Sequence, residues 1–125
     1  MCRPAILLLW IAGILFPMAW LTRFSATYSR LFERVFNPLW VHVLMHALLF
    51  AVLAYLVARH MAGRAVAARR WRTAVLVLGI VVVIAVAQEA IQLLYKARVV
   101  GADEVLDVGI DLAGGVFGML VGGLK

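Results

Sequence analysis

Polar residues that could do chemistry recur about one helical turn apart in this chain, inside segments that are otherwise apolar. Three such sets occur, and they are His42 and His46, Glu89 and Gln92, and Asp107 and Asp111. Spacings of three or four residues place both members of a set on one face of a helix. Imidazole, carboxylate and amide groups that meet in one place can bind a polar ligand. Where they are buried, their protonation can also be tuned for acid–base work.

The segments that carry these residues predict an integral membrane protein. The chain has 125 residues, 66% of them hydrophobic and only 14% charged, with a mean hydropathy of +1.06. A helix needs roughly 20 apolar residues to cross a hydrocarbon core of about 30 Å. Four stretches reach that length, at about residues 4–22, 38–58, 73–95 and 105–124. Because lipid offers the backbone no hydrogen-bond partners, we expect one all-α domain, 1–125, folded as a four-helix membrane bundle.

Basic residues at the ends of these spans predict the orientation of the bundle. Seven Lys and Arg residues lie on the side of the termini and the second loop, against five on the other side. The positive-inside rule therefore places both termini in the cytoplasm, and the chain becomes a multi-pass protein of the inner membrane. The loops lack the aromatic interleaving of a nucleic-acid-binding surface, so we expect the lipid bilayer and no nucleic acid as a partner.

The loop between the first two spans predicts a short helix of its own. Its apolar residues follow the spacing of one helical face, and they are Tyr28, Leu31, Phe32, Val35 and Phe36. This pattern is typical of an amphipathic helix that lies flat at the membrane surface. Asn37 and Pro38 follow it, and we expect Asn37 to cap the second span with Pro38 in its first turn.

The polar sets fall at one membrane depth. With a rise of about 1.5 Å per residue, His46 lies roughly 12 Å from the start of the second span. By the same rule Glu89 lies roughly 9 Å from the end of the third, and Asp111 roughly 9 Å from the start of the fourth. Because successive spans run in opposite directions, all three positions belong to the extracytoplasmic side. The sequence therefore predicts a shared polar site beneath the outer headgroups.

Each polar residue also has a structural explanation. Asp103 and Glu104 open the fourth span, where acids cap the helix and complement its dipole. Asp111 is too deep for a cap and needs a buried partner. His42 is close enough to the surface to be an ordinary polar flank, whereas His46 is expected to hydrogen-bond a carboxylate rather than to ligate a metal. We predict no metal site and no cofactor.

Glycines mark the face of the fourth span that packs. Gly114, Gly118 and Gly122 repeat every four residues, and small residues at this spacing let helices approach closely in lipid. We expect this face to turn inward and to carry the aspartates with it. The alternative is that the same glycines join copies of the chain in a homo-oligomer.

Several of these positions together resemble the VanZ-like family of bacterial membrane proteins. The resemblance rests on His46, Phe50, Gln88, Glu89, Gln92, Arg98, Asp107, Asp111, Gly114 and Gly118. In that family Asn usually stands where this chain has Asp111. The resemblance implies a cell-envelope context, since the family is named for a protein of glycopeptide (teicoplanin) antibiotic resistance. It implies no reaction.

Three functions remain open at this point. In the first, an outer-leaflet pocket binds a lipid, a lipid-linked envelope precursor or a lipoglycopeptide, without catalysis. Its expected ligand-binding residues are His42, His46, Gln88, Glu89, Gln92, Lys96, Arg98, Asp107 and Asp111. In the second, the chain is a small intramembrane hydrolase or transferase, with Glu89, Asp107 and His46 as candidate catalytic residues. In the third, a homo-oligomer conducts ions or protons past the same carboxylates. Because the chain has no recognisable nucleophile motif, we favour binding.

Overall fold

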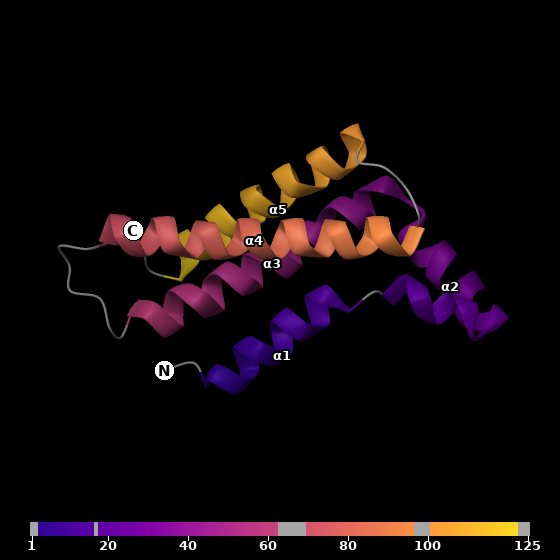
Figure 1. Cartoon of the computed structure of the whole chain (residues 1–125), viewed down its shortest axis with the longest axis horizontal. Helices are drawn as coiled ribbons and strands as arrows, with labels where there is room; N and C mark the ends of the chain where they lie inside the picture. Colours follow the sequence, from indigo (N-terminus) through magenta and orange to yellow (C-terminus); the bar gives the residue numbers. More distant parts are fainter. Residues whose placement is uncertain (1–2, 17, 63–69, 97–100, 123–125) are drawn as a thin grey trace.

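The chain folds into helices that run mostly along one long axis (Figure 1). The computed structural model describes residues 3–16, 18–62, 70–96 and 101–122, and these contain five α-helices, one 3₁₀ helix and no strand. In chain order the elements are α1 (Pro4–Leu15), η1 (Met18–Arg23), α2 (Ala26–Phe36), α3 (Leu39–Ala62), α4 (Arg70–Lys96) and α5 (Ala102–Val121). The all-α prediction is therefore confirmed for the described residues.

Two helices are long and apolar enough to cross a membrane. They are α3, with 24 residues, and the 25-residue segment Arg70–Leu94 of α4. α5 is 20 residues long, but its acidic residues interrupt its apolar character. α1 is a shorter apolar helix of 12 residues that ends at Leu15, so the first predicted span, 4–22, is not one continuous helix. The bend predicted near Pro17 lies outside the described residues.

The connector helix α2 forms where the sequence predicts a helix. The Ser25 hydroxyl caps its start by accepting the Tyr28 backbone N–H at 3.2 Å, and ring contacts link Tyr28, Phe32 and Phe36 along one face. The role predicted for Asn37 is wrong. Its backbone N–H donates to the Glu33 carbonyl oxygen at 2.9 Å and so ends α2.

Pro38, and not Asn37, occupies the N-cap position of α3. Its carbonyl oxygen accepts the backbone N–H groups of Val41 and His42, at 3.1 and 3.3 Å, and so starts the hydrogen bonding of α3. Only this residue separates the Asn37 cap of α2 from the first residue of α3, so the two helices join without a loop.

α5 packs more extensively on α3 than on any other helix. A Cβ added at Gly114 would overlap the carbonyl oxygen of Ala47, and one added at Gly118 would overlap that of Ala51. The two backbones therefore touch, which only residues without a side chain allow. Both α3 and α5 begin at the same end of the molecule and run parallel (Figure 1).

The core fills the space between α3, α4 and α5 and reaches α1. Its buried hydrophobic residues are Ile14, Phe50, Leu53, Ala54, Val57, Ala58, Val77, Val81, Ala85 and Met119. Polar hydrogen bonds hold α1 against this core. The Trp10 indole N–H donates to the Leu49 carbonyl oxygen at 3.0 Å, and the Gln88 amide donates to the Ile14 carbonyl oxygen at 3.3 Å.

Antiparallel packing of α4 brings three helix ends together. The start of α3, the end of α4 and the start of α5 lie at the end of the molecule where α2 also lies (Figure 1). The start of α1 and the end of α5 lie at the opposite end. The fold thus gathers the polar residues of three separate segments at one end of the molecule.

Candidate functional site

A buried histidine–aspartate pair joins α3 to α5. His46 Nδ1 lies 2.8 Å from Asp111 Oδ1, and the side chains are 7% and 0% exposed. In the ionised form of Asp111 the carboxylate oxygen accepts, and the Nδ1–H of His46 donates. The second oxygen of Asp111, Oδ2, is buried without a hydrogen-bond partner among the described residues. His46 therefore has the carboxylate partner that the sequence predicted, and that partner is Asp111.

A second pair of the same kind lies one helical turn toward the starts of both helices. His42 Nε2 is 3.1 Å from Oδ1 and 3.2 Å from Oδ2 of Asp107. These side chains are more open, at 39% and 15% exposed. His42 therefore has a carboxylate partner of its own and is more than a polar flank. The two histidine rings are in contact, with 4.5 Å between their centroids and an angle of 42° between their planes.

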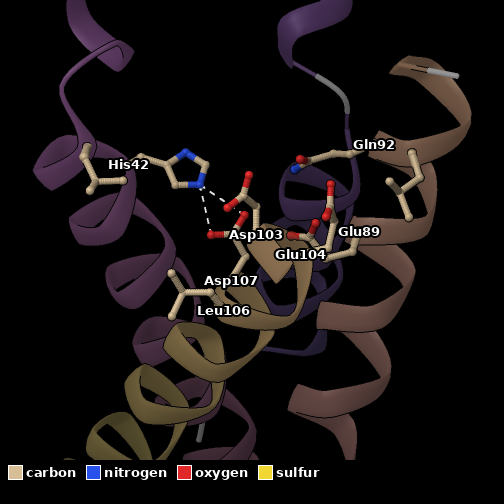
Figure 2. A pocket seen from close by; sticks show the side chains of 9 residues that line it. His42, Glu89, Gln92, Asp103, Glu104, Leu106 and Asp107 are labelled. Atoms are coloured by element: carbon tan, nitrogen blue, oxygen red, sulfur yellow. Dashed lines mark hydrogen bonds and ion pairs between the residues drawn. The ribbon is translucent and has the colours of Figure 1, made fainter. Parts of the chain in front are cut away.

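A pocket opens beside the outer pair (Figure 2). It encloses about 270 Å³ at the junction of the three helix ends. Its lining residues are Leu39, His42, Glu89, Gln92, Leu93, Asp103, Glu104, Leu106 and Asp107. Figure 2 shows Glu89 and Gln92 facing the acidic residues of the start of α5 across this space.

Asp103 and Glu104 line this pocket, which the sequence analysis did not predict. Glu104 also caps α5, since its Oε2 accepts the Gly101 backbone N–H at 2.9 Å. The sequence analysis assigned both acids to helix capping alone. The available signal was their spacing, because Asp103 lies four residues before Asp107 and therefore on the same helical face.

Other predicted site residues lie apart from the pocket. Gln88 is buried and donates its amide hydrogen bond to Ile14 in α1, so it positions a helix. His46 and Asp111 lie in the packing between α3 and α5 and do not line the pocket. Lys96 ends α4, but its side chain is not among the described groups, and Arg98 lies outside the described residues.

The charged residues among the described pocket lining are all acidic. The described lining carries four carboxylates, from Glu89, Asp103, Glu104 and Asp107, and no Lys or Arg. Such a lining attracts cations and hydrogen-bond donors and disfavours anionic groups. Leu39, Leu93 and Leu106 add apolar surface to the same cavity. The combination suits a ligand that has a polar, donor-bearing part beside an apolar part.

Groups able to ligate a metal ion also meet here. His42, His46 and Asp107 each offer a ligand atom within 4.8 Å of the other two, and so do His46, Glu89 and Asp111.

No family model, curated protein or solved structure matches this chain. Its chemistry therefore has to be argued from its own residues.

Proposed function

We propose that this chain is a four-span membrane protein whose polar pocket binds an amphiphile at the extracytoplasmic surface. The carrying observation is the pocket at the junction of three helix ends, with four carboxylates beside three leucines. A headgroup that donates hydrogen bonds through amine or hydroxyl groups matches the carboxylates, and an acyl chain matches the leucines. Lipids, lipid-linked envelope precursors and lipoglycopeptides all include such molecules.

The apolar outer surface supports a bilayer location. Large hydrophobic side chains are exposed on every α-helix, among them Leu8, Leu9, Leu44, Leu48, Val75, Val83, Leu106 and Phe117. Soluble monomers rarely expose contiguous apolar surface of this extent. Two helices already satisfy the length and apolarity of a membrane span. In the four-span arrangement, α1 with η1 and α5 supply the other two.

Charge supports the direction of insertion. Arg59, Arg70 and Arg72 lie at the end of the molecule opposite the pocket, near the junction of α3 and α4. Arg23, Arg30 and Arg34 lie at the pocket end, in η1 and α2. Over the whole sequence seven Lys and Arg residues belong to the side opposite the pocket and five to the pocket side, so the positive-inside rule favours the outer leaflet for the pocket. Membership of the VanZ-like family, with its envelope context, is part of this proposal.

Lipid retention tests the proposal. The full-length protein, reconstituted in nanodiscs and released for native mass spectrometry, is compared across three lipids: a zwitterionic phospholipid with an amine headgroup, an uncharged glycolipid with a polyol headgroup, and a phospholipid with an exposed anionic phosphate. We expect the amine-bearing or polyol lipid to be retained in preference to the anionic one, because the described lining is acidic. Equal retention of all three would contradict a specific pocket, and conversion of a retained lipid to a product would replace binding with catalysis.

A matched pair of variants localises the effect. Glu89→Gln removes a carboxylate from the pocket, whereas Glu33→Gln makes the same change on the exposed surface of α2. We expect Glu89→Gln to lower retention and Glu33→Gln to leave it unchanged, with both proteins inserted normally. If Glu89→Gln instead abolishes insertion, Glu89 has a structural role and the pocket proposal loses its main residue.

A further inference from the structure

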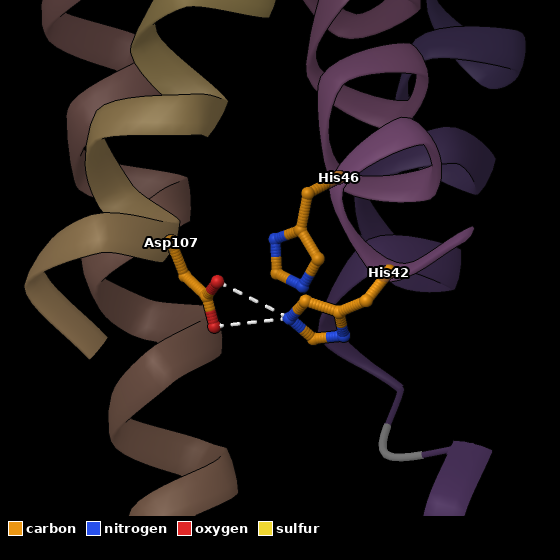
Figure 3. Close-up of side chains that lie close together, drawn as sticks. All are labelled: His42, His46 and Asp107. Carbon is orange, nitrogen blue, oxygen red and sulfur yellow. Dashed lines mark hydrogen bonds and ion pairs between the residues drawn. The ribbon is translucent and has the colours of Figure 1, made fainter. Parts of the chain in front are cut away.

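We infer that His42, His46 and Asp107 form a binding site for a divalent transition-metal ion of the zinc type. The three side chains lie together at the interface of α3 and α5 (Figure 3), with one ligand atom of each within 4.8 Å of the other two. The site stands whether or not the chain binds an amphiphile.

The distances are those of groups that can share an ion. Two ligand atoms about 2.0 Å from one tetrahedral ion lie roughly 3.3 Å apart. His42 Nε2 is 3.1 and 3.2 Å from the two oxygens of Asp107, so this pair already has that separation. An ion at this position replaces the Nε2 proton of His42, because a ligating imidazole must be neutral. His46, which has a ligand atom within 4.8 Å of the other two, would have to move closer to supply the third bond.

His46 is prepared for the same ion by its buried partner. Asp111 accepts the Nδ1–H of His46 at 2.8 Å, which fixes the tautomer and leaves the lone pair on Nε2. Figure 3 shows the other edge of this imidazole, which carries Nε2, facing His42. Metal-ligating histidines nearly always donate their other N–H to a carboxylate or carbonyl, and such partners orient the ring. Asp111 is therefore a positioning residue.

Charge favours a dication at this place. Asp107 belongs to a pocket lining with four carboxylates and no Lys or Arg among its described members, and Asp111 adds a fifth, fully buried carboxylate beneath. Buried charges in proteins are paired or coordinate metals. Two imidazoles with one carboxylate suit zinc and related ions, and the pocket leaves an open coordination position for water or for a headgroup atom.

The deeper trio of His46, Glu89 and Asp111 is the competing position. Its use would require Asp111 to exchange the His46 proton for the ion, in a space closed on all sides by packing. The outer trio keeps that hydrogen bond and is reached through the pocket, because His42 and Asp107 line it. The two positions share His46 but differ in every other ligand.

Titration of the purified full-length protein tests the site. After treatment with a chelator, the protein in detergent is titrated with Zn²⁺ by calorimetry and with Co²⁺ by visible absorption. We expect one ion per chain, proton release on binding and the Co²⁺ spectrum of nitrogen and oxygen ligands. His42→Gln and Asp107→Asn should each weaken binding by at least about tenfold, as changes near metal sites do. His60→Gln and Glu33→Gln, matched changes outside the trio and outside the pocket lining, should leave it unchanged.

Two results would overturn the inference. One is the absence of saturable binding of either ion. The other is binding that survives His42→Gln but is lost in Glu89→Gln, which would place the ion in the deeper trio. Because His42 is 39% exposed, its replacement is compatible with folding, and circular dichroism checks this. Lipid retention by the metal-free protein is measured separately, so failure of one proposal does not imply failure of the other.

Discussion

His46 and Asp111 meet in the packed interior between α3 and α5, whereas His42 and Asp107 meet one helical turn away at the wall of a pocket. The groups and the helices are the same in both pairs. The contacts differ, because His46 uses Nδ1 toward one oxygen of Asp111, whereas His42 uses Nε2 toward both oxygens of Asp107. The surroundings differ as well. Burial makes the inner pair costly to break and closes it off except for the edge of His46 that faces His42, while exposure makes the outer pair a weak contributor to stability and an accessible binding group. One repeated motif thus supplies structure at one depth and chemistry at the next.

Removal of the inner carboxylate should have the largest effect on stability. We expect Asp111→Ala to lower the free energy of unfolding by about 3 kcal/mol, because the change strands the buried imidazole and opens a cavity. Unfolding of the detergent-solubilised protein, followed by far-ultraviolet circular dichroism, measures this. Asp111→Asn keeps an acceptor for His46 and should cost less. A loss below about 1 kcal/mol for Asp111→Ala would mean that burial does not separate the two pairs.

A larger residue in place of Gly114 should disturb both histidine–aspartate pairs together. A methyl group at Gly114 has no room against Ala47, so Gly114→Ala should force α3 and α5 apart and cost about 1–3 kcal/mol. Gly109→Ala on the same helix is the control, because nothing lies within 4 Å of an added Cβ there. That change should be neutral or stabilising by up to about 1 kcal/mol, since alanine favours helix. Equal effects of the two changes would show that the close contact does not hold the pairs.

Removal of the outer carboxylate should change stability little. Asp107→Asn is expected to cost about 0–1 kcal/mol, with a smaller effect at high salt, because His42 is largely open to solvent. The same unfolding measurement, repeated at two salt concentrations, checks this. A cost equal to that of Asp111→Ala would erase the contrast between the pairs.

A small effect confined to one helix end is expected at the start of α5, beyond the outer pair. Glu104→Gln replaces a charged acceptor of the Gly101 N–H by a neutral one and should cost about 0.3–1 kcal/mol through weaker capping and a weaker dipole interaction. Amide hydrogen exchange at the first turn of α5 measures it. Unchanged protection there, with altered protection of α3, would indicate that Glu104 acts through the pocket instead.

Periodicity was enough to predict which residues share a face. It placed His42 with His46, Asp107 with Asp111 and the glycines on one stripe, because these relations depend only on the helical repeat. It could not predict which histidine meets which aspartate. That pairing depends on how far α5 is shifted along α3, and the shift is set by the contacts of Gly114 and Gly118 with the α3 backbone.

The ends of the helices were harder to predict than their faces. Hydropathy treated residues 4–22 as one span, although the regular helix stops at Leu15 and a 3₁₀ helix follows from Met18. Asn37 was read as a start signal because Asn favours N-caps, but the same residue can also end the preceding helix. Local preference does not decide between two adjacent helices when one residue could serve either.

The spacing of the paired groups has a consequence for the alignment of α3 and α5. Asp103, Asp107 and Asp111 repeat every four residues, as do His42 and His46, so a slip of one turn, about 5.4 Å, would offer each histidine another aspartate. The histidines alone therefore tolerate two alignments.

The glycine stripe breaks this ambiguity. After such a slip Ile110 would stand where Gly114 now meets Ala47, and its branched side chain has no space there. Asp111 would meanwhile take the place of Gly115 against Val81, a residue of the hydrophobic core. Gly114 thus prevents this slip, and the choice between chemically equivalent partners is made by a residue that has no side chain.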